Sequence, residues 1–348
     1  MKVKCNIGYL TNILTWGILL LLLNTIWAQE TKSANARQVR LYTTAQSKEI
    51  VVKNLDEEKS IAKPENKNQA ISDNLTKNAE AVKKLRQIID EKYSYRNLRS
   101  VNWDSLFKQY GPRMENAKTV NEFAEAAAQM LSQAKDMHLW VKVNGQAVEG
   151  FKRKIFRNYN LNLLGKIIPS WRQYNDRVCS GRIDKNIGYI LIKSWASEKP
   201  ETLEAAFDAL KQFSDCQGFI IDVRPNAGGS ETLAEKFAGC FVNAPAVYAK
   251  HIFRDIDDPK GWSKMHERIL SPNPDRPPYR GRVAVLMGHA NLSSCEAFIL
   301  MMKQVPDCVL VGGKSYGSSG NPKPYDLGNG VEVWIPSWKA LRPDGTCF

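Results

Sequence analysis

The sequence predicts an α/β protein with a small helical bundle before its main core. From residue 187 onward, short apolar stretches bounded by glycine, asparagine or serine alternate with amphipathic stretches. Between residues 74 and 134, three consecutive segments carry apolar residues at helical spacing. Alternating strands and helices are typical of layered α/β domains. We therefore expect a three-helix bundle over residues 74–142, a short irregular connector over 143–186 and an α/β core over 187–348.

Size and composition are those of a globular protein with about two domains. The chain has 348 residues, 43% of them hydrophobic, which is enough for a substantial core. The formal net charge is +13, but the basic residues are spread along the chain beside 36 acidic ones. No zinc-finger spacing, nucleic-acid motif or phosphate-binding glycine loop is present. We expect no nucleic-acid partner, no metal and no cofactor; the oligomeric state is not readable.

The first residues have the pattern of a secretory signal peptide over residues 1–28. Lys2 and Lys4 precede an apolar run over 13–23, and the small residue Ala28 ends it. The competing interpretation is an uncleaved anchor, which would be the protein's only membrane contact. Residues 29–73 are rich in Lys, Glu, Asn and Ser and predict a disordered spacer. The pattern predicts export to a periplasmic or extracellular space.

Each element of the bundle and connector follows from local patterning. The helices are expected over about 74–93, 103–110 and 119–134, with Thr119 or Asn121 capping the third. The connector is expected to hold short strands such as LNLLGKIIP, residues 161–169. It is too short for a peptide-gripping PDZ module, so none is expected.

The core elements are predicted by apolar runs and the turn residues between them. Strands are expected at 187–195, 218–224, 282–287 and 309–312, helices at 200–213, 231–240 and from 294, and a hairpin through 325–334.

A turn with two serines joins the strand at 282–287 to the following helix. Ser293 and Ser294 stand where a helix N-cap is expected, with Glu296 in the first turn. A serine on a strand-to-helix turn is also where an acyl-transfer nucleophile lies, near free N–H groups and the positive end of the helix dipole. The turn alone leaves both interpretations open.

A second turn, after the strand at 218–224, has no side-chain bulk. Asp222 and Arg224 end the strand, and Asn226, Gly228 and Gly229 form the loop. Backbone N–H groups of such a loop can approach a ligand oxygen closely. An ordinary strand-to-helix turn is the alternative.

Together, GFIIDVRPNAGG, VLMGHANLSSCEAF and VLVGGKSYGSSGNP closely resemble the tail-specific (C-terminal processing) serine protease family. The bundle resembles that of its tricorn-like and interphotoreceptor retinoid-binding branch. The resemblance implies a ClpP/crotonase-like core. It implies Ser293, three residues before Glu296, as the nucleophile, with oxyanion donors at Ser294, Gly228 and Gly229. Asp222, Arg224, Asn226 and Glu296 are the supporting motif.

The resemblance also implies the general base. Members with a Ser-Lys pair have lysine where this chain has Ser318, and Lys314 lies four residues too early. In the tricorn-like branch the base is a histidine that ends the bundle, here His138 of Asp136-Met137-His138. His289 is the rival, and we interpret it as a turn-stabilising residue.

The family's relay glutamate follows the final Asp-Gly, and this chain reaches Asp344-Gly345 and ends at Phe348. We expect a truncated form of an exported serine endopeptidase that acts on peptides or unfolded proteins. The alternative is a non-catalytic binding protein of the same fold, inactive without the glutamate, for an apolar ligand or peptide. A crotonase-like acyl-CoA enzyme ranks last, because Ser293 would have no purpose in it.

Overall fold

The computed structural model describes residues 39–42, 51–54, 64–196 and 198–348. The chain divides into two compact units, residues 1–69 and residues 70–348. In the first unit, β1 (Val39–Tyr42) pairs with β2 (Val51–Asn54) in antiparallel fashion. The expected signal peptide, residues 1–28, lies outside the described residues. Of the expected disordered spacer, residues 29–73, the structure describes these two strands and residues 64–73, which begin a helix.

Three helices form the bundle of the second unit: α2 (Pro64–Lys92), α3 (Trp103–Glu115) and α4 (Val120–Ser132). Helix α2 begins ten residues before the expected start, because the preceding Lys, Glu, Gln and Ala residues are good helix formers. The side chain of Thr119, one of the two residues expected to cap α4, accepts the N–H of Glu122 at 3.1 Å. Asn102 caps α3 in the same way, accepting the N–H of Ser105 at 3.0 Å.

A four-stranded sheet packs on this bundle, and its strands come from both ends of the unit. Its order is β13 (Pro322–Asp326), β14 (Val331–Pro336), β3 (Trp140–Val143) and β4 (Gln146–Val148). The hairpin of β13 and β14 was predicted; its pairing with β3 was not. Met130 of α4, Val141 of β3 and Val333 of β14 share one buried core. The bundle is therefore completed by residues from the far end of the chain.

The main core is a six-stranded sheet. Its order is β12 (Val309–Gly312), β11 (Arg282–Met287), β8 (Gly218–Asp222), β7 (Ile187–Ile192), β6 (Val178–Asp184) and β5 (Arg172–Gln173). The four strands from β12 to β7 are parallel, and β6 pairs in antiparallel fashion with both of its neighbours, β7 and β5. The carboxyl ends of β8 and β11 therefore lie side by side, which brings the glycine loop and the serine turn together.

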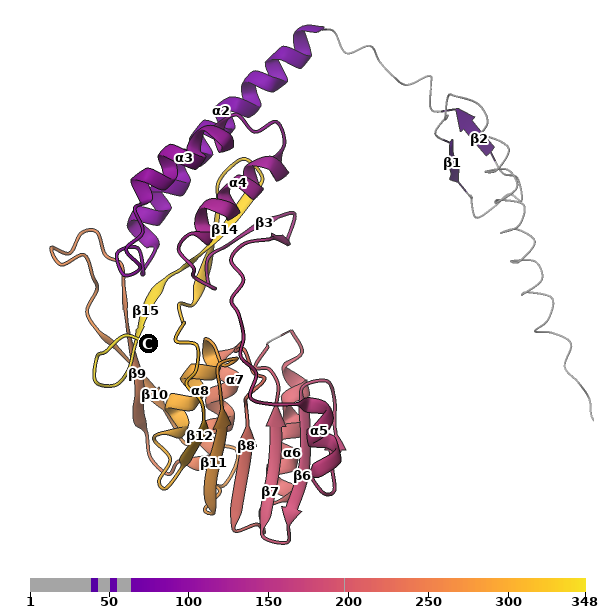
Figure 1. The fold of residues 1–348 in the computed structure, drawn as a ribbon, viewed down its shortest axis with the longest axis vertical. Coiled ribbons are helices and arrows are strands. Elements are labelled where there is room, and N and C mark those ends of the chain that lie inside the picture. The colour runs from indigo at the N-terminus through magenta and orange to yellow at the C-terminus, as the bar shows by residue number, and fades with distance from the viewer. Residues whose placement is uncertain (1–38, 43–50, 55–63, 197) are drawn as a thin grey trace, which may run out of the picture. The chain divides into compact units, whose positions relative to one another are not determined.

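Helices cover both faces of this sheet (Figure 1). One face packs against η3 (Pro200–Leu203), α6 (Glu204–Gln212), α7 (Glu231–Ala238), η4 (Gly239–Phe241) and α8 (Ser294–Met302). The other face packs against α5 (Leu161–Ile167) through Leu164. The prediction of a strand at 161–169 is therefore wrong: Asn160 caps a helix by accepting the N–H of Leu163 at 3.2 Å. The connector also contributes β5 and β6 to the sheet.

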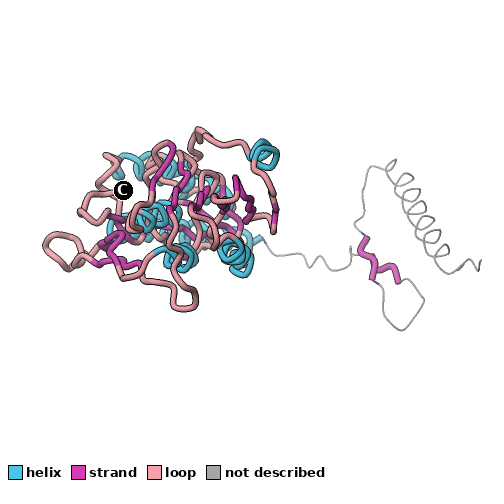
Figure 2. The backbone as a smooth tube through the Cα atoms, turned by 90° about the horizontal axis from the view of Figure 1, so that it is seen from below, coloured by secondary structure: helices cyan, strands magenta, loops and turns pink. Residues whose placement is uncertain are grey.

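A third sheet was not predicted at all. Its order is β10 (His266–Leu270), β9 (Ala246–Phe253) and β15 (Trp338–Leu341). A loop over residues 254–265 joins β9 to β10. In the turned view, loops, drawn pink, lie around much of the edge of the described helices and strands (Figure 2). Among the described helices, none is both long enough and apolar enough to cross a bilayer.

Candidate active site

Ser293 sits between β11 and α8 in a strained backbone conformation, with φ 57° and ψ −127°. An ordinary N-cap residue has extended, negative-φ geometry, so the conformation of Ser293 is not that of a normal cap, although its N–H pairs with the carboxylate of Glu296 as in a capping box. Holding a non-glycine residue in such a region costs about 1–3 kcal/mol and persists only where the surroundings enforce it. A strained strand-to-helix turn is the geometry that exposes a nucleophilic serine in the α/β-hydrolases.

The backbone on either side of Ser293 is fixed by hydrogen bonds. Its N–H donates to the carbonyl of Ser318 at 2.8 Å and lies 3.2 Å from the carboxylate of Glu296. Its own carbonyl accepts the N–H of Glu296 at 2.8 Å. Two segments, the first turn of α8 and the loop after β12, thus hold the strained residue in place.

Glu296 is the buried centre of this arrangement. Its carboxylate also accepts from the hydroxyl of Ser315 at 2.6 Å, the N–H of Gly317 at 2.6 Å and the N–H of Ser318 at 2.8 Å. Burial raises the pKa of Glu296, and these donors offset only part of that rise. Its role is to join the serine turn to the loop over 315–318.

Asn291 joins the serine turn to the glycine loop. Its side-chain oxygen accepts the N–H of Gly288 at 2.7 Å. Its amide donates to the carbonyls of Val223 at 2.5 Å and Asn226 at 3.1 Å. Its full burial beside a serine turn marks it as the clamp between two loops.

The glycine loop lies directly against the serine turn. Gly228 has φ +103°, and a Cβ on it would lie 2.7 Å from the carbonyl oxygen of Leu292 and 3.1 Å from the nitrogen of Ser294. Gly229 has φ +134°, and a Cβ there would lie 2.4 Å from the carbonyl oxygen of Trp195. Both positions therefore require glycine for conformation and for space.

The expected oxyanion donors differ in their availability. The N–H of Gly228 donates to the side-chain oxygen of Asn226 at 2.8 Å. Two backbone hydrogen bonds join this loop to Trp195: the carbonyl of Gly228 accepts the N–H of Trp195, and the N–H of Ser230 donates to the carbonyl of Trp195. The N–H of Gly229 takes part in neither of these two bonds. The hydroxyl of Ser294 donates to the carbonyl of Gly229 at 2.6 Å, while its N–H is the first of α8.

Asp222 and Arg224 hold the end of β8 rather than contacting the serine turn. The fully buried Asp222 accepts from the hydroxyl of Tyr189 at 2.6 Å and pairs with Arg224 at 2.5 Å. Arg224 also donates to the carbonyl of Asn158 at 2.9 Å. This pair fixes the strand end from which the glycine loop departs.

His138 is buried at the end of the bundle, with its Nδ1 3.0 Å from the hydroxyl oxygen of Ser318. The carboxylate of Asp136 lies 3.8 Å from the same nitrogen and accepts the backbone N–H of His138 at 2.9 Å. It also accepts the hydroxyl of Tyr93 at 2.8 Å. Ser318, noted in the sequence only where a lysine was absent, therefore touches His138 through its side chain and Ser293 through its carbonyl.

The carboxylate of Asp136 stays ionised although it is buried. Burial would raise its pKa, but hydrogen bonding and attraction to His138, together with attraction to Arg99, bring the pKa below its ordinary value.

The rival histidine, His289, faces a different set of groups. Its Nδ1 accepts the N–H of Phe156 at 3.3 Å, and its ring packs against Phe156 and Tyr316. It helps to hold the segment before α5 against the turn after β11.

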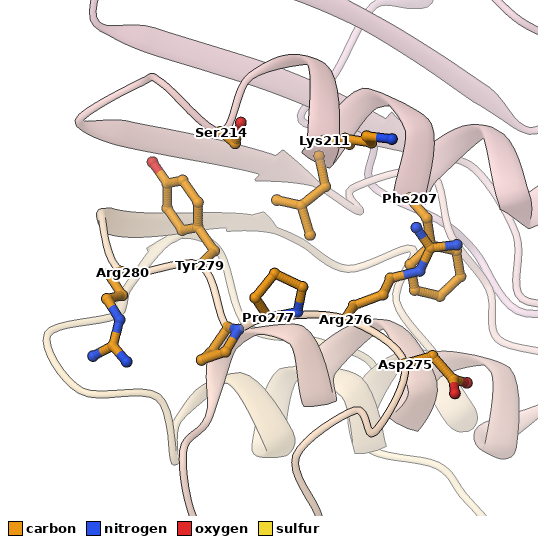
Figure 3. Close-up of a pocket in the computed structure, with 10 residues that line it drawn as sticks. Phe207, Lys211, Ser214, Asp275, Arg276, Pro277, Tyr279 and Arg280 are labelled. Atoms are coloured by element: carbon orange, nitrogen blue, oxygen red, sulfur yellow. The ribbon is translucent and has the colours of Figure 1, made fainter.

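A cavity of about 530 Å³ lies elsewhere. It is bounded by α6 on one side and residues 275–280 on the other, with Lys211, Arg276 and Arg280 around it (Figure 3). The hydroxyl of Tyr279 donates to the carbonyl of Cys216, just before β8 begins. The cavity is therefore at the amino ends of the strands, away from Ser293. No cluster of possible metal ligands occurs in the described part of the chain.

Comparison with known proteins finds two family matches along the chain. Residues 186–348 match the model of peptidase family S41, and residues 81–132 match the tricorn protease C1 domain. Over these two segments the chain is similar to proteases of these families. The resemblance to the tail-specific proteases that the sequence motifs indicated is thereby confirmed.

Individual relatives are distant. The carboxy-terminal processing protease CtpB of Bacillus subtilis is 24% identical over 160 residues, which cover 46% of this chain and 31% of the relative. The aligned part thus spans about a third of that curated relative.

Among solved structures, a putative peptidase from Parabacteroides merdae is 22% identical, with TM-score 0.63 and coverage of 79% and 85% of the two chains. Mature CPAF complexed with lactacystin is 11% identical, with TM-score 0.58 and coverage of 78% and 92%. At these identities the structures support a common fold.

Proposed function

We propose that this protein is a serine endopeptidase in which Ser293 is the nucleophile and His138 the general base. The observation that carries the proposal is the strained conformation of Ser293, with φ 57° on a strand-to-helix turn pressed against a glycine loop. A serine that only capped a helix would have no need of this strain.

In the proposed reaction, the Oγ of Ser293 forms a bond to a peptide carbonyl carbon while its proton passes to Nε2 of His138. The carbonyl oxygen becomes an oxyanion held by the N–H groups of Gly229 and Ser294, with Gly228 as a third donor if Asn226 releases it. His138 then returns the proton to the departing amine, and water hydrolyses the acyl-enzyme by the same route. Donors placed where negative charge develops are worth several kcal/mol.

Ser318 and Asp136 are proposed as the groups that orient His138. With Nδ1 facing the hydroxyl of Ser318 at 3.0 Å, the other ring nitrogen is left for the nucleophile. The charged carboxylate of Asp136, 3.8 Å from Nδ1, favours the imidazolium that forms during attack. These two contacts support the proposal that His138 is oriented by groups within the described residues.

The proposal extends to the core type, the domain plan and the location. Four parallel strands with α6, α7 and α8 on one face support a ClpP/crotonase-like core. The connector over 143–186 is occupied by β4, α5, β5 and β6, which supports the absence of a PDZ module. The signal-like pattern of residues 1–28 supports export to a periplasmic or extracellular space, where the substrates are peptides or unfolded proteins.

An active-site fluorophosphonate probe tests this function. We expect it to label the folded wild type and to leave Ser293→Ala unlabelled. The matched control is Ser214→Ala, an exposed serine at the opposite end of the sheet, which should label like the wild type. Equal labelling of wild type and Ser293→Ala would reject Ser293 as the nucleophile, and no labelling of the folded wild type would favour a binding protein.

A further inference from the structure

One basic and apolar segment passes beside the candidate site. We call residues 150–160, between β4 and α5, the basic strap; it contains Lys152, Arg153, Lys154 and Arg157 and no acidic residue. The acid-free stretch continues to residue 175 and includes two further cations. Such a concentration of one charge sign creates a local positive potential, in contrast to the mixed charges along the rest of the chain.

Hydrogen bonds hold the strap against the carboxyl ends of β8 and β11. Arg153 donates to the carbonyls of His289 at 2.8 Å and Ala290 at 2.6 Å, and its guanidinium lies over the ring of Tyr316. Asn158 donates to the carbonyl of Met287 at 2.9 Å. In Figure 1 the segment between β4 and α5 runs across this end of the sheet. The strap is thus tied to the same turn that carries Ser293.

The outward side of the strap is both apolar and cationic. Phe156 is 61% exposed and Ile155 is 41% exposed. Lys154 and Arg157 are exposed beside them, and the ammonium of Lys154 lies 5.2 Å from the centre of the Phe156 ring. Arg153 is occupied in anchoring the strap, and Lys152 pairs with Glu149 at 2.6 Å. Lys154 and Arg157 are therefore the cations of the strap that are available to a partner. A partner that fits this surface carries carboxylates next to apolar side chains.

We propose that the basic strap binds the substrate polypeptide and selects unfolded segments that carry acidic residues beside apolar ones. The proposal rests on the proposed function, because it assigns the strap to the substrate of Ser293. An extended chain advances about 3.3 Å per residue, so the residues that reach the strap lie within a few positions of the scissile bond. A polypeptide is favoured over a membrane surface because the strap is anchored at the turn that leads into Ser293.

The expected discrimination is modest and depends on salt. Exposed ion pairs are individually weak, so two cations should favour an acidic over a neutral peptide by about three- to tenfold in kcat/KM. Screening should remove most of this preference at about 0.5 M salt, where charges interact only over a few ångströms. The apolar contacts of Ile155 and Phe156 should not weaken with salt.

The test uses quenched fluorescent peptides that share one scissile core and differ only in flanking Asp and Glu against Asn and Gln. We expect the wild type to prefer the acidic peptide at low salt and Lys154→Glu/Arg157→Glu to lose or invert that preference, mainly through KM. The control is Lys83→Glu/Lys84→Glu on α2, which changes the charge equally at an exposed site in the bundle. Unfolding midpoints check that both variants are folded.

Binding separates failure of this proposal from failure of the proposed function. The same peptides, labelled for anisotropy, are titrated onto Ser293→Ala, which needs no catalysis. Tighter binding of the acidic peptide that is lost in the strap variant supports the inference even if the wild type proves inactive. Equal binding of both peptides, an equal preference in strap and control variants, or strap-dependent binding only to vesicles of anionic lipid would overturn it.

Discussion

Replacing Glu296 by glutamine should loosen the serine turn without changing the volume of the side chain. Each carboxylate oxygen of Glu296 receives two donors: Ser315 and Gly317 on one, Ser318 and Ser293 on the other. Glutamine offers only one acceptor oxygen. The better orientation places its NH₂ group toward Ser315, whose hydroxyl can turn to accept, and leaves the N–H of Gly317 unpaired.

The size of the effect follows from these contacts. One buried N–H without a partner costs about 1–3 kcal/mol, and the remaining bonds lose their charge assistance. Removing a charge whose pKa burial has raised offsets part of this loss. We expect a net loss of about 2–4 kcal/mol in the free energy of unfolding, or a fall of roughly 5–15 °C in the unfolding midpoint of a chain of this size.

Urea unfolding, followed by circular dichroism, measures the loss, and probe labelling reports the serine. The control is Glu122→Gln in α4, where an exposed glutamate accepts the single N–H of Lys118 at 2.8 Å. Glutamine serves well in such a capping position, so this control should lose less than about 0.5 kcal/mol. Similar losses in the two variants would show that the four-donor account of Glu296 is wrong.

Three further changes test other parts of the structure. Gly228→Ala adds a Cβ 2.7 Å from the carbonyl oxygen of Leu292, and it should lower the free energy of unfolding in urea by about 2–5 kcal/mol and abolish probe labelling. The control Gly145→Ala, at a position with positive φ but open space, should cost only about 1 kcal/mol. Equal costs in the two variants would contradict the packing argument. Ser318→Ala should lower kcat about tenfold or more and shift the acidic limb of the pH profile of kcat. Ser318→Thr should restore both, and the neighbouring Ser319→Ala should leave both near wild type. An unchanged profile in Ser318→Ala would show that Ser318 is not part of the site. Burial, with Arg268 and His266 nearby, lowers the pKa of His251 to about 4 from an ordinary 6.5. Between these pH values the folded state binds fewer protons than the unfolded state, so the free energy of unfolding should fall as pH drops from 6.5 to 4. Urea unfolding at several pH values should show a smaller fall in His251→Asn, and an equal fall in both proteins would contradict this role of His251.

Local sequence was sufficient for the elements that carry the serine and the glycines. Apolar runs with turn residues on both sides predicted β7, β8, β11 and β12, and the same turns hold Ser293 and Gly228. These signals are local because a buried parallel strand needs a continuous apolar run and a turn needs particular residues.

The errors have physical reasons of two kinds. In α5 the apolar residues at 161, 163, 164, 167 and 168 fit a strand and a helix about equally, and the cap at Asn160 was not recognised. The contact of His138 with Ser318 joins residues 180 apart in the sequence, and no local pattern specifies such a pair. The resemblance to a family supplied the histidine, but not its partner.

The pairing of β14 with β3 has a consequence for the order of folding. Asn329 donates to the buried Asn78 across 251 residues of sequence, and Tyr95 reaches the carbonyl of Ser319 across 224. The helical bundle therefore cannot bury its own apolar face until the hairpin near the far end of the chain has been synthesised. Contacts of such long separation close slowly, because the intervening chain must first be ordered. During synthesis the bundle should remain exposed to proteolysis, and it becomes protected in the same step that brings His138 to Ser318.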